Sequence, residues 1–247
     1  MKIIISPAKG MEVNTDTMDW KRYPIFLEDT KKICSIIQNM SYKEVKTLWK
    51  CNDKIATLNY ERFQMMDIES NLTPAILAYY GLAYQHMAPM VFTNQAYQYI
   101  ESNLRILSGF YGILSPFDGV VPYRLEMQAK LSVDGKSDLY AFWGDRLYKE
   151  LAKETSVIVN LASKEYSRVV EKYVSKDIKF ITCIFGELVN GKIVQKSALA
   201  KMARGEMVRF MAENQITKVQ QMKEFSALGF SFSEEYSSEK EMVFIKS

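Results

Sequence analysis

The chain opens on a short apolar run. Residues 2–6 are predicted to form a buried strand, because three consecutive isoleucines follow Lys2 and Pro7 stops the run. The pair Asn190-Gly191, between two apolar stretches, predicts a tight hairpin turn. The strands that these patterns predict lie at residues 2–6, 104–108, 123–127, 157–160, 178–189, 192–195, 230–233 and 242–245.

Helical spacing of apolar residues dominates the first third of the chain. Ser41 and Glu44 form a capping-box sequence, which begins one helix. Asn52 or Asp53 caps the next helix, and Ser163 caps a later one. Helices are predicted from residue 26 onward and at residues 41–49, 53–63, 75–80, 139–153, 164–170 and 197–214, with a shorter one after Thr217.

The order of these elements sets the expected fold class. Helices and strands interleave irregularly, which favours a single mixed α/β (α+β) domain over residues 1–247 rather than a clean doubly wound sheet. No glycine-rich loop follows a strand, which argues against a nucleotide-binding Rossmann or Walker motif. No apolar stretch approaches about 18 residues, so no membrane association is expected.

The charged residues add little by themselves. The 247 residues include 32 Lys and Arg and 29 Asp and Glu, and the resulting net charge of +3 is spread over both halves of the chain. A mild excess of this kind permits a local basic face, but it does not by itself indicate a nucleic-acid partner.

The scarcity of histidine and cysteine excludes more chemistry. His86 is the single histidine, so a His-based zinc site, a His-dependent triad and a two-His iron site are not expected unless His86 alone serves. We therefore predict no tight iron or other metal site and no cofactor. Cys34, Cys51 and Cys183 are odd in number and widely spaced, and no secretory signal opens the sequence, so we expect a cytoplasmic protein.

Polar and charged side chains that could bind an anion occur after one predicted strand and on another. Ser6 and Lys9 come after the first strand, where they could bind an anion, act as nucleophile and base, or form a plain turn. Arg124 and Glu126 would share one face of a strand. Arg124 there either holds a phosphate or forms an internal ion pair with Glu126.

Two later segments add a helix N-terminus and a basic helix. Asn160 and Ser163 lead into a helix whose first amides favour a negative charge, although an N-cap role also explains Ser163. Farther on, Arg204 and Arg209 lie about 60° and about 80° to either side of Lys201 around a helix. This basic face either meets phosphates or is solvated.

Together these segments resemble the YaaA family of bacterial peroxide-stress proteins. They occur in the order of the family and span almost the whole chain. The matching stretches are Ile5-Ser6-Pro7-Ala8-Lys9, Leu107-Ser108-Gly109, Tyr111-Gly112, Pro122-Tyr123-Arg124-Leu125-Glu126-Met127, Phe142-Trp143-Gly144-Asp145, Asn160-Leu161-Ala162-Ser163, Glu165-Tyr166 and Lys201-x-Ala203-Arg204-Gly205-x-Met207-x-Arg209-Phe210.

The resemblance implies a cytoplasmic protein of the hydroperoxide response that limits free iron, and with it oxidative damage, and that binds duplex DNA. It also implies a family-specific fold with a helix-hairpin-helix element, for which residues 41–63 are the candidate. The Gly-x-Gly hairpin usual in such motifs is absent from the joining residues 50–52. The candidate DNA contacts are Lys50, Lys54, Arg204 and Arg209.

Two functions stay open at this point. The first is a module that grips the DNA backbone without sequence preference. The second is an enzyme that acts on a phosphorylated or carboxylated small molecule or on nucleic acid, with a pocket lined by Ser6, Lys9, Arg124, Glu126, Asn160, Ser163 and Lys201. In that pocket Lys9, Arg124 and Lys201 are expected to approach one another around an acid or a bound phosphate.

Overall fold

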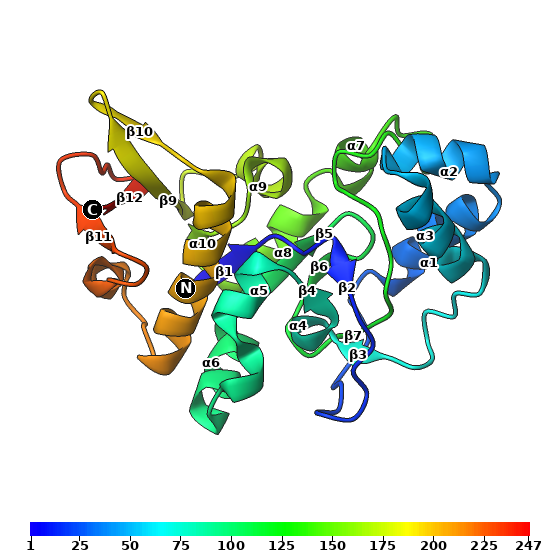
Figure 1. The fold of residues 1–247 in the computed structure, drawn as a ribbon, viewed down its shortest axis with the longest axis horizontal. Helices are drawn as coiled ribbons and strands as arrows, with labels where there is room; N and C mark the ends of the chain where they lie inside the picture. Colours follow the sequence, from blue (N-terminus) through cyan, green and yellow to red (C-terminus); the bar gives the residue numbers. More distant parts are fainter.

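The computed structural model describes residues 1–247, and a single eight-stranded sheet forms its centre (Figure 1). Across the sheet the strands run β11 (Phe230–Ser233), β12 (Glu241–Lys246), β9 (Lys179–Val189), β8 (Val157–Asn160), β1 (Lys2–Ile5), β5 (Leu104–Ser108) and β6 (Gly112–Leu114), and β10 (Lys192–Val194) forms a hairpin with β9. Parallel and antiparallel neighbours both occur, so the predicted mixed α/β fold class is confirmed.

Strand β1 lies in the middle of this sheet and is parallel to both of its neighbours, β5 and β8. It is buried on both faces, since Ile3 and Ile4 are fully inaccessible, as expected for a central parallel strand. The chain reaches β5 on one side of β1 first and adds β8 on the other side later. The sequence pattern did not predict this reversal. The reversal in strand order leaves a crevice at the carboxyl ends of β1 and β8, which is where open α/β sheets bind ligands.

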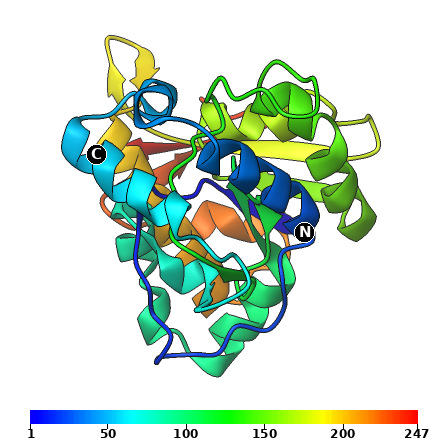
Figure 2. The ribbon, with the colours of Figure 1, turned by 90° about the vertical axis from the view of Figure 1, so that its right-hand side faces the viewer.

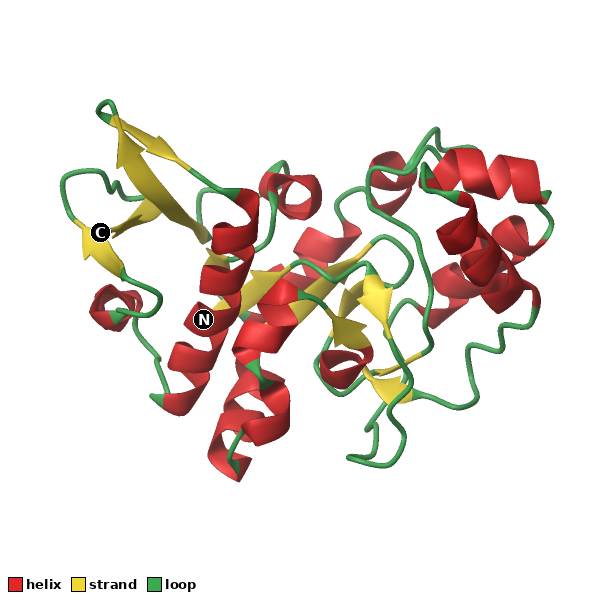
Figure 3. Cartoon of the chain, in the orientation of Figure 1, coloured by secondary structure: helices red, strands yellow, loops and turns green.

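Helices surround the sheet on both sides (Figure 2). They are α1 (Leu27–Gln38), α2 (Tyr42–Trp49), α3 (Asp53–Gln64), α4 (Ala75–Ala78), α5 (Leu82–Met87), α6 (Asn94–Asn103), α7 (Leu139–Trp143), α8 (Arg146–Glu154), α9 (Lys164–Glu171) and α10 (Ser197–Glu213), with 3-10 turns η1 (Pro89–Val91) and η2 (Val219–Glu224). Figure 3 shows α1, α2 and α3 gathered beyond one end of the sheet, with the β9–β10 hairpin at the opposite end. No helix combines the length and the apolar character that a membrane crossing requires.

Two small sheets lie beside the central sheet, and the first of them lines the crevice together with a close helix contact. The pairs are β2 (Gly10–Met11) with β4 (Tyr79–Tyr80), and β3 (Thr73–Pro74) with β7 (Gly119–Val120). Helix α5 packs closely on α10 at Gly205, where a Cβ would lie 2.0 Å from the Ala83 carbonyl oxygen. Any side chain at Gly205 would therefore push α5 away from α10.

Three sequence predictions need correction. Residues 123–127 form no strand but a loop, because their backbone packs against Gly109 instead of pairing in the sheet. The predicted helix 139–153 is broken at Gly144, whose φ of +54 ends α7 before α8 begins. The predicted helix 75–80 stops at Ala78, because Tyr79 and Tyr80 pair with β2.

Candidate functional site

The loops that follow β1 and β8 are joined by their serines. The backbone N–H of Ser163 donates to the Ser6 hydroxyl oxygen at 2.8 Å, and the Ser6 hydroxyl donates to the Ser163 hydroxyl at 3.2 Å. Asn160 shapes the second loop, since its Oδ1 accepts from the Ala162 N–H at 2.9 Å. Ser163 does precede α9 as predicted, but its side chain bonds to Ser6 instead of capping the helix.

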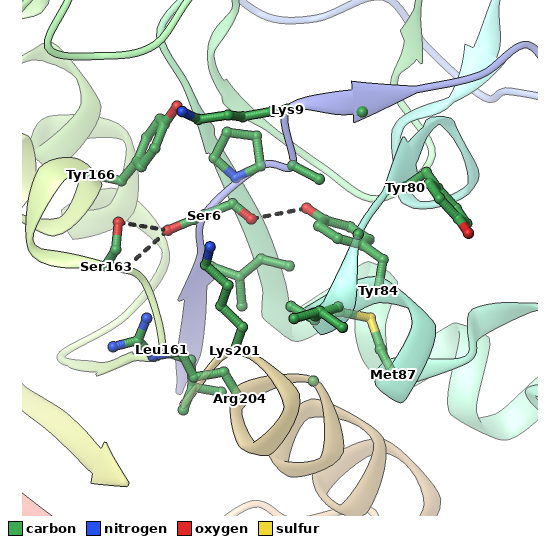
Figure 4. Close-up of a pocket in the computed structure, with 18 of the residues that line it drawn as sticks. Ser6, Lys9, Tyr80, Tyr84, Met87, Leu161, Ser163, Tyr166, Lys201 and Arg204 are labelled. Atoms are coloured by element: carbon green, nitrogen blue, oxygen red, sulfur yellow. Dashed lines mark hydrogen bonds between the residues drawn. The ribbon is translucent and has the colours of Figure 1, made fainter. Parts of the chain in front are cut away.

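A cavity of about 330 Å³ opens beside these serines, as Figure 4 shows. Helix α5 forms its opposite wall, where the Tyr84 hydroxyl donates to the Ser6 carbonyl oxygen at 3.0 Å. Burial raises the pKa of Tyr84 well above its usual range, so the phenol stays protonated. The polar side chains around the cavity are Ser6, Lys9, Tyr80, Tyr84, Ser163, Glu165, Tyr166, Lys201 and Arg204.

Two cations from α10 line this cavity, and neither has an acidic partner. Lys201 extends toward Ser6 in Figure 4, and the guanidinium of Arg204 lies on the Ser163 side. No ion pair forms at either residue, and the Arg204 Nε is buried without any hydrogen-bond acceptor. Burial also lowers the pKa of Arg204, which means that its charge is poorly compensated by water.

The Glu126 carboxylate forms ion pairs with Lys9 and Arg124, two of the three cations that were expected to approach one another. Glu126 pairs with Arg124 at 2.8 Å and with Lys9 at 3.3 Å, which selects the internal ion pair among the two roles considered for Arg124. Lys9 lines the cavity together with Lys201, whereas Arg124, Glu126 and Asn160 do not line it. The structure thus joins Lys9 to Arg124 through Glu126 and places Lys9 and Lys201 in the lining of one cavity, but it does not gather all three cations around one point.

A second and larger hollow, of about 950 Å³, lies between α2 and the loop of residues 126–130. We call it the basic groove. Its five cations outnumber its two carboxylates, Glu44 and Glu126. The cations are Lys9, Lys43, Lys50, Lys130 and Arg168. Lys43, Lys50 and Arg168 form no ion pair, and Arg168 stacks over the Tyr140 ring at 4.4 Å.

The predicted helices at residues 41–49 and 53–63 are both present, as α2 and α3, joined by a tight turn with Lys50 in the left-handed conformation. The N-terminus of α3 already carries a carboxylate. The Asp53 Oδ1 lies 2.6 Å from the Lys46 ammonium, which holds the pKa of Asp53 below its usual value. A phosphate at this helix end would be repelled by that carboxylate. The basic groove is lined by residues of α2 and by none of α3.

The four residues expected to contact DNA lie in different places. Lys50 lines the basic groove, and Lys54 is exposed on α3 outside it. Arg204 lines the cavity instead of sharing an open face, because α10 packs against α5 on that side. Arg209 pairs with Glu213 at 2.9 Å, away from both hollows.

Sequence reasoning missed Lys43, Lys130 and Arg168 in the groove and Tyr84 in the cavity. The first three are isolated cations in segments far apart in the chain, so no local pattern joins them. Nowhere do three His, Cys, Asp or Glu side chains gather closely enough to hold a metal ion. Burial raises the pKa of Cys34 to about 11 and that of Cys183 to about 12.

Comparison with known proteins adds a family. A family model described as "Peroxide stress protein YaaA" matches residues 1–236. A UPF0246 protein of Pediococcus pentosaceus is 52% identical over 246 residues, which cover 100% of this chain and 98% of that protein. UPF0246 proteins of Desulfitobacterium hafniense and Lachnoclostridium phytofermentans are 53% and 50% identical, again over 100% of this chain and over 98% and 96% of their own lengths.

Proposed function

The chain belongs to the family of the peroxide stress protein YaaA, and we propose that it acts in the cytoplasmic hydroperoxide response by binding duplex DNA in the basic groove. Protein bound to the DNA in this way would shield it from iron-dependent oxidation. The observation that carries the proposal is the groove itself, where five of the chain's cations face two carboxylates although the whole chain has a net charge of only +3.

The groove suits a phosphate backbone better than base edges. Lysine ammonium groups dominate its charged lining, and the three cations without ion pairs need no acid to be displaced before they meet a phosphate. Contacts of this kind give affinity without sequence preference and release counterions when they form. We keep residues 41–63 as the candidate helix-hairpin-helix element, with α2 as its DNA-facing helix.

The test compares two double variants. Lys43→Ala/Lys50→Ala removes unpaired groove lysines, and Lys54→Ala/Lys192→Ala removes two exposed lysines outside the groove that form no ion pair. Affinity for two unrelated duplexes is measured against salt concentration. The groove variant should weaken binding equally for both duplexes and flatten the logarithmic salt slope by about 2, at roughly 0.9 per lost contact, while the control keeps the wild-type slope.

Equal behaviour of the two variants would remove the groove from the DNA site. A second measurement addresses the peroxide role, namely strand breakage of plasmid DNA by ferrous iron and hydrogen peroxide. Wild-type protein and the Lys54→Ala/Lys192→Ala control should slow breakage, and the groove variant should not. Unchanged protection by the groove variant would separate protection from DNA binding and contradict the proposal.

A second candidate function is the binding or conversion of a small anionic molecule. It is favoured by the cavity at the carboxyl ends of β1 and β8, where Lys201 and Arg204 lie without acidic partners. The geometry supports binding more than nucleophilic catalysis, because the Ser6 hydroxyl bonds to Ser163 and no base is hydrogen-bonded to it.

A further inference from the structure

We propose that the cavity between the β1 and β8 loops binds a 5′-nucleotide, with the phosphate monoester at Ser6, Ser163, Lys201 and Arg204 and the nucleoside against α5. The nucleotide is either free or the phosphorylated 5′ end of a DNA strand, since both present the same group. This inference rests on the second candidate function, and its preference for a nucleotide over other phosphorylated ring compounds also rests on DNA binding in the adjacent basic groove.

The charges of the cavity call for a dianion. The exposed Lys201 and the largely buried Arg204 both line it, and a cation removed from water, as Arg204 is, is stabilised by an anion beside it. Glu165 is the only carboxylate in the lining. It accepts a hydrogen bond at 3.3 Å from the N–H of Gln128, a residue that lines the basic groove. A phosphate monoester carries a charge of about −1.5 to −2 at pH 7, which matches two cations better than one carboxylate does.

Hydrogen-bond donors are available at the same end. The first amides of α9, those of Lys164 and Glu165, have no acceptor in the protein, and they follow directly on Ser163. The Ser163 hydroxyl accepts from Ser6 and keeps its own proton free to donate. The buried Arg204 Nε also lacks an acceptor. These donors, together with the helix dipole, suit the several terminal oxygens of one phosphate.

The opposite wall is apolar and aromatic. Leu82, Tyr84 and Met87 of α5 form it, and Leu161 and Tyr166 line the cavity on the Ser163 side, as Figure 4 shows. A bare anion would leave this wall in contact with water, whereas an attached ring would cover it. The cavity volume of about 330 Å³ lies within the range of roughly 300–1,000 Å³ that is typical of small-molecule sites.

Lys9 connects the cavity with the basic groove. It lines both hollows, and Glu126, to which it is paired at 3.3 Å, lines the groove. A DNA strand in the groove could therefore end with its 5′ phosphate in the cavity, with Lys9 between the two. This adjacency favours a nucleotide over other phosphorylated ring compounds.

The experiment is calorimetric titration of the full chain with deoxyadenosine 5′-monophosphate, deoxyadenosine and inorganic phosphate. The monophosphate should bind most tightly, because it alone fills both ends of the cavity. Lys201→Ala should weaken it about 10-fold or more, as expected for the loss of a charged contact. Lys196→Ala, at the start of the same helix but paired with Glu187 at 2.6 Å outside the cavity, should leave the affinity unchanged.

A second arm distinguishes the two sources of the nucleotide. Duplexes with and without a 5′ phosphate are compared on wild type, Lys201→Ala and Lys43→Ala/Lys50→Ala. If the strand end is the ligand, the phosphate should tighten DNA binding in a way that Lys201→Ala abolishes and the groove variant retains. If the free nucleotide is the ligand, the phosphorylated end should have no effect while the monophosphate still binds.

Three results would overturn the inference. They are equal affinity for deoxyadenosine and its monophosphate, equal loss in Lys201→Ala and Lys196→Ala, and no binding of either the monophosphate or the phosphorylated end. The failure of the DNA proposal looks different, since it appears as an unchanged salt slope in the groove variant while nucleotide binding persists.

Discussion

The N–H of Ser163 donates to the hydroxyl oxygen of Ser6 at 2.8 Å, across 157 residues of sequence. This bond ties the ends of β1 and β8 together, next to the cavity that both loops line. It also gives a half-buried backbone donor a partner that no secondary structure supplies.

Ser6→Ala should therefore lower the free energy of unfolding by about 1–2 kcal/mol, because it leaves the Ser163 N–H without an acceptor. Ser163→Ala is the matched control, since it keeps the Ser6 acceptor and should cost less than about 1 kcal/mol. Urea denaturation at neutral pH measures both. A larger loss in Ser163→Ala would reverse the roles assigned to the two hydroxyls.

The two cations on Glu126 should differ sharply in their contribution to stability. Arg124→Ala should cost about 3 kcal/mol, because Arg124 and Glu126 have side chains only 11% exposed and the acid would be left poorly paired. Lys9→Ala should cost less than about 1 kcal/mol, since the Lys9 side chain is 68% exposed. Equilibrium unfolding in urea checks the difference, and similar losses in both variants would contradict it.

Asp118 should make stability depend on pH. Burial raises its pKa to about 6, although Arg22 donates to it at 3.0 Å. The folded state therefore holds this proton more tightly than the unfolded state, and the resulting stabilisation, complete below about pH 4, is lost as pH rises through about 6. Between pH 4 and pH 7, wild type should lose about 2–3 kcal/mol relative to Asp118→Asn. Urea unfolding at both pH values measures this, and a constant difference between the two proteins would refute it.

The buried thiols should resist peroxide and alkylation. The raised pKa values of Cys34 and Cys183, about 11 and about 12, keep both protonated at neutral pH, and both are buried. Iodoacetamide should label Cys51 first in the native protein and all three cysteines in urea. Mass spectrometry of the labelled peptides checks this. Rapid native labelling of Cys34 would point to a reactive thiol.

Local signals in the sequence predicted local structure well. Ser41 with Glu44 and Asn52 cap α2 and α3 as expected, because a capping bond spans only three residues. Asn190-Gly191 forms the turn between β9 and β10 for the same reason. The closing strands β11 and β12 also pair as predicted.

Relationships between distant segments were not predictable in the same way. Arg204 was assigned to an open basic face, yet it lies in the cavity because Gly205 lets α5 approach α10. Lys43 and Arg168 face one groove only because the fold brings α2 and α9 to the same hollow. Side-chain spacing along one element carries no information about which other element will cover it.

The central position of β1 has a consequence for synthesis of the chain. Its three isoleucines are made well before their partners on β5 and β8, which begin only at residues 104 and 157. At a translation rate of roughly 5–20 residues per second, β1 waits about 8–30 seconds for its second neighbour. Until β5 has been made the strand has no native contact on either edge, and from then until residue 157 its β8 edge stays unpaired. The β8 edge of β1 is therefore open to non-native pairing for the longest time, and folding of the sheet is expected to be completed after most of the polypeptide has been made.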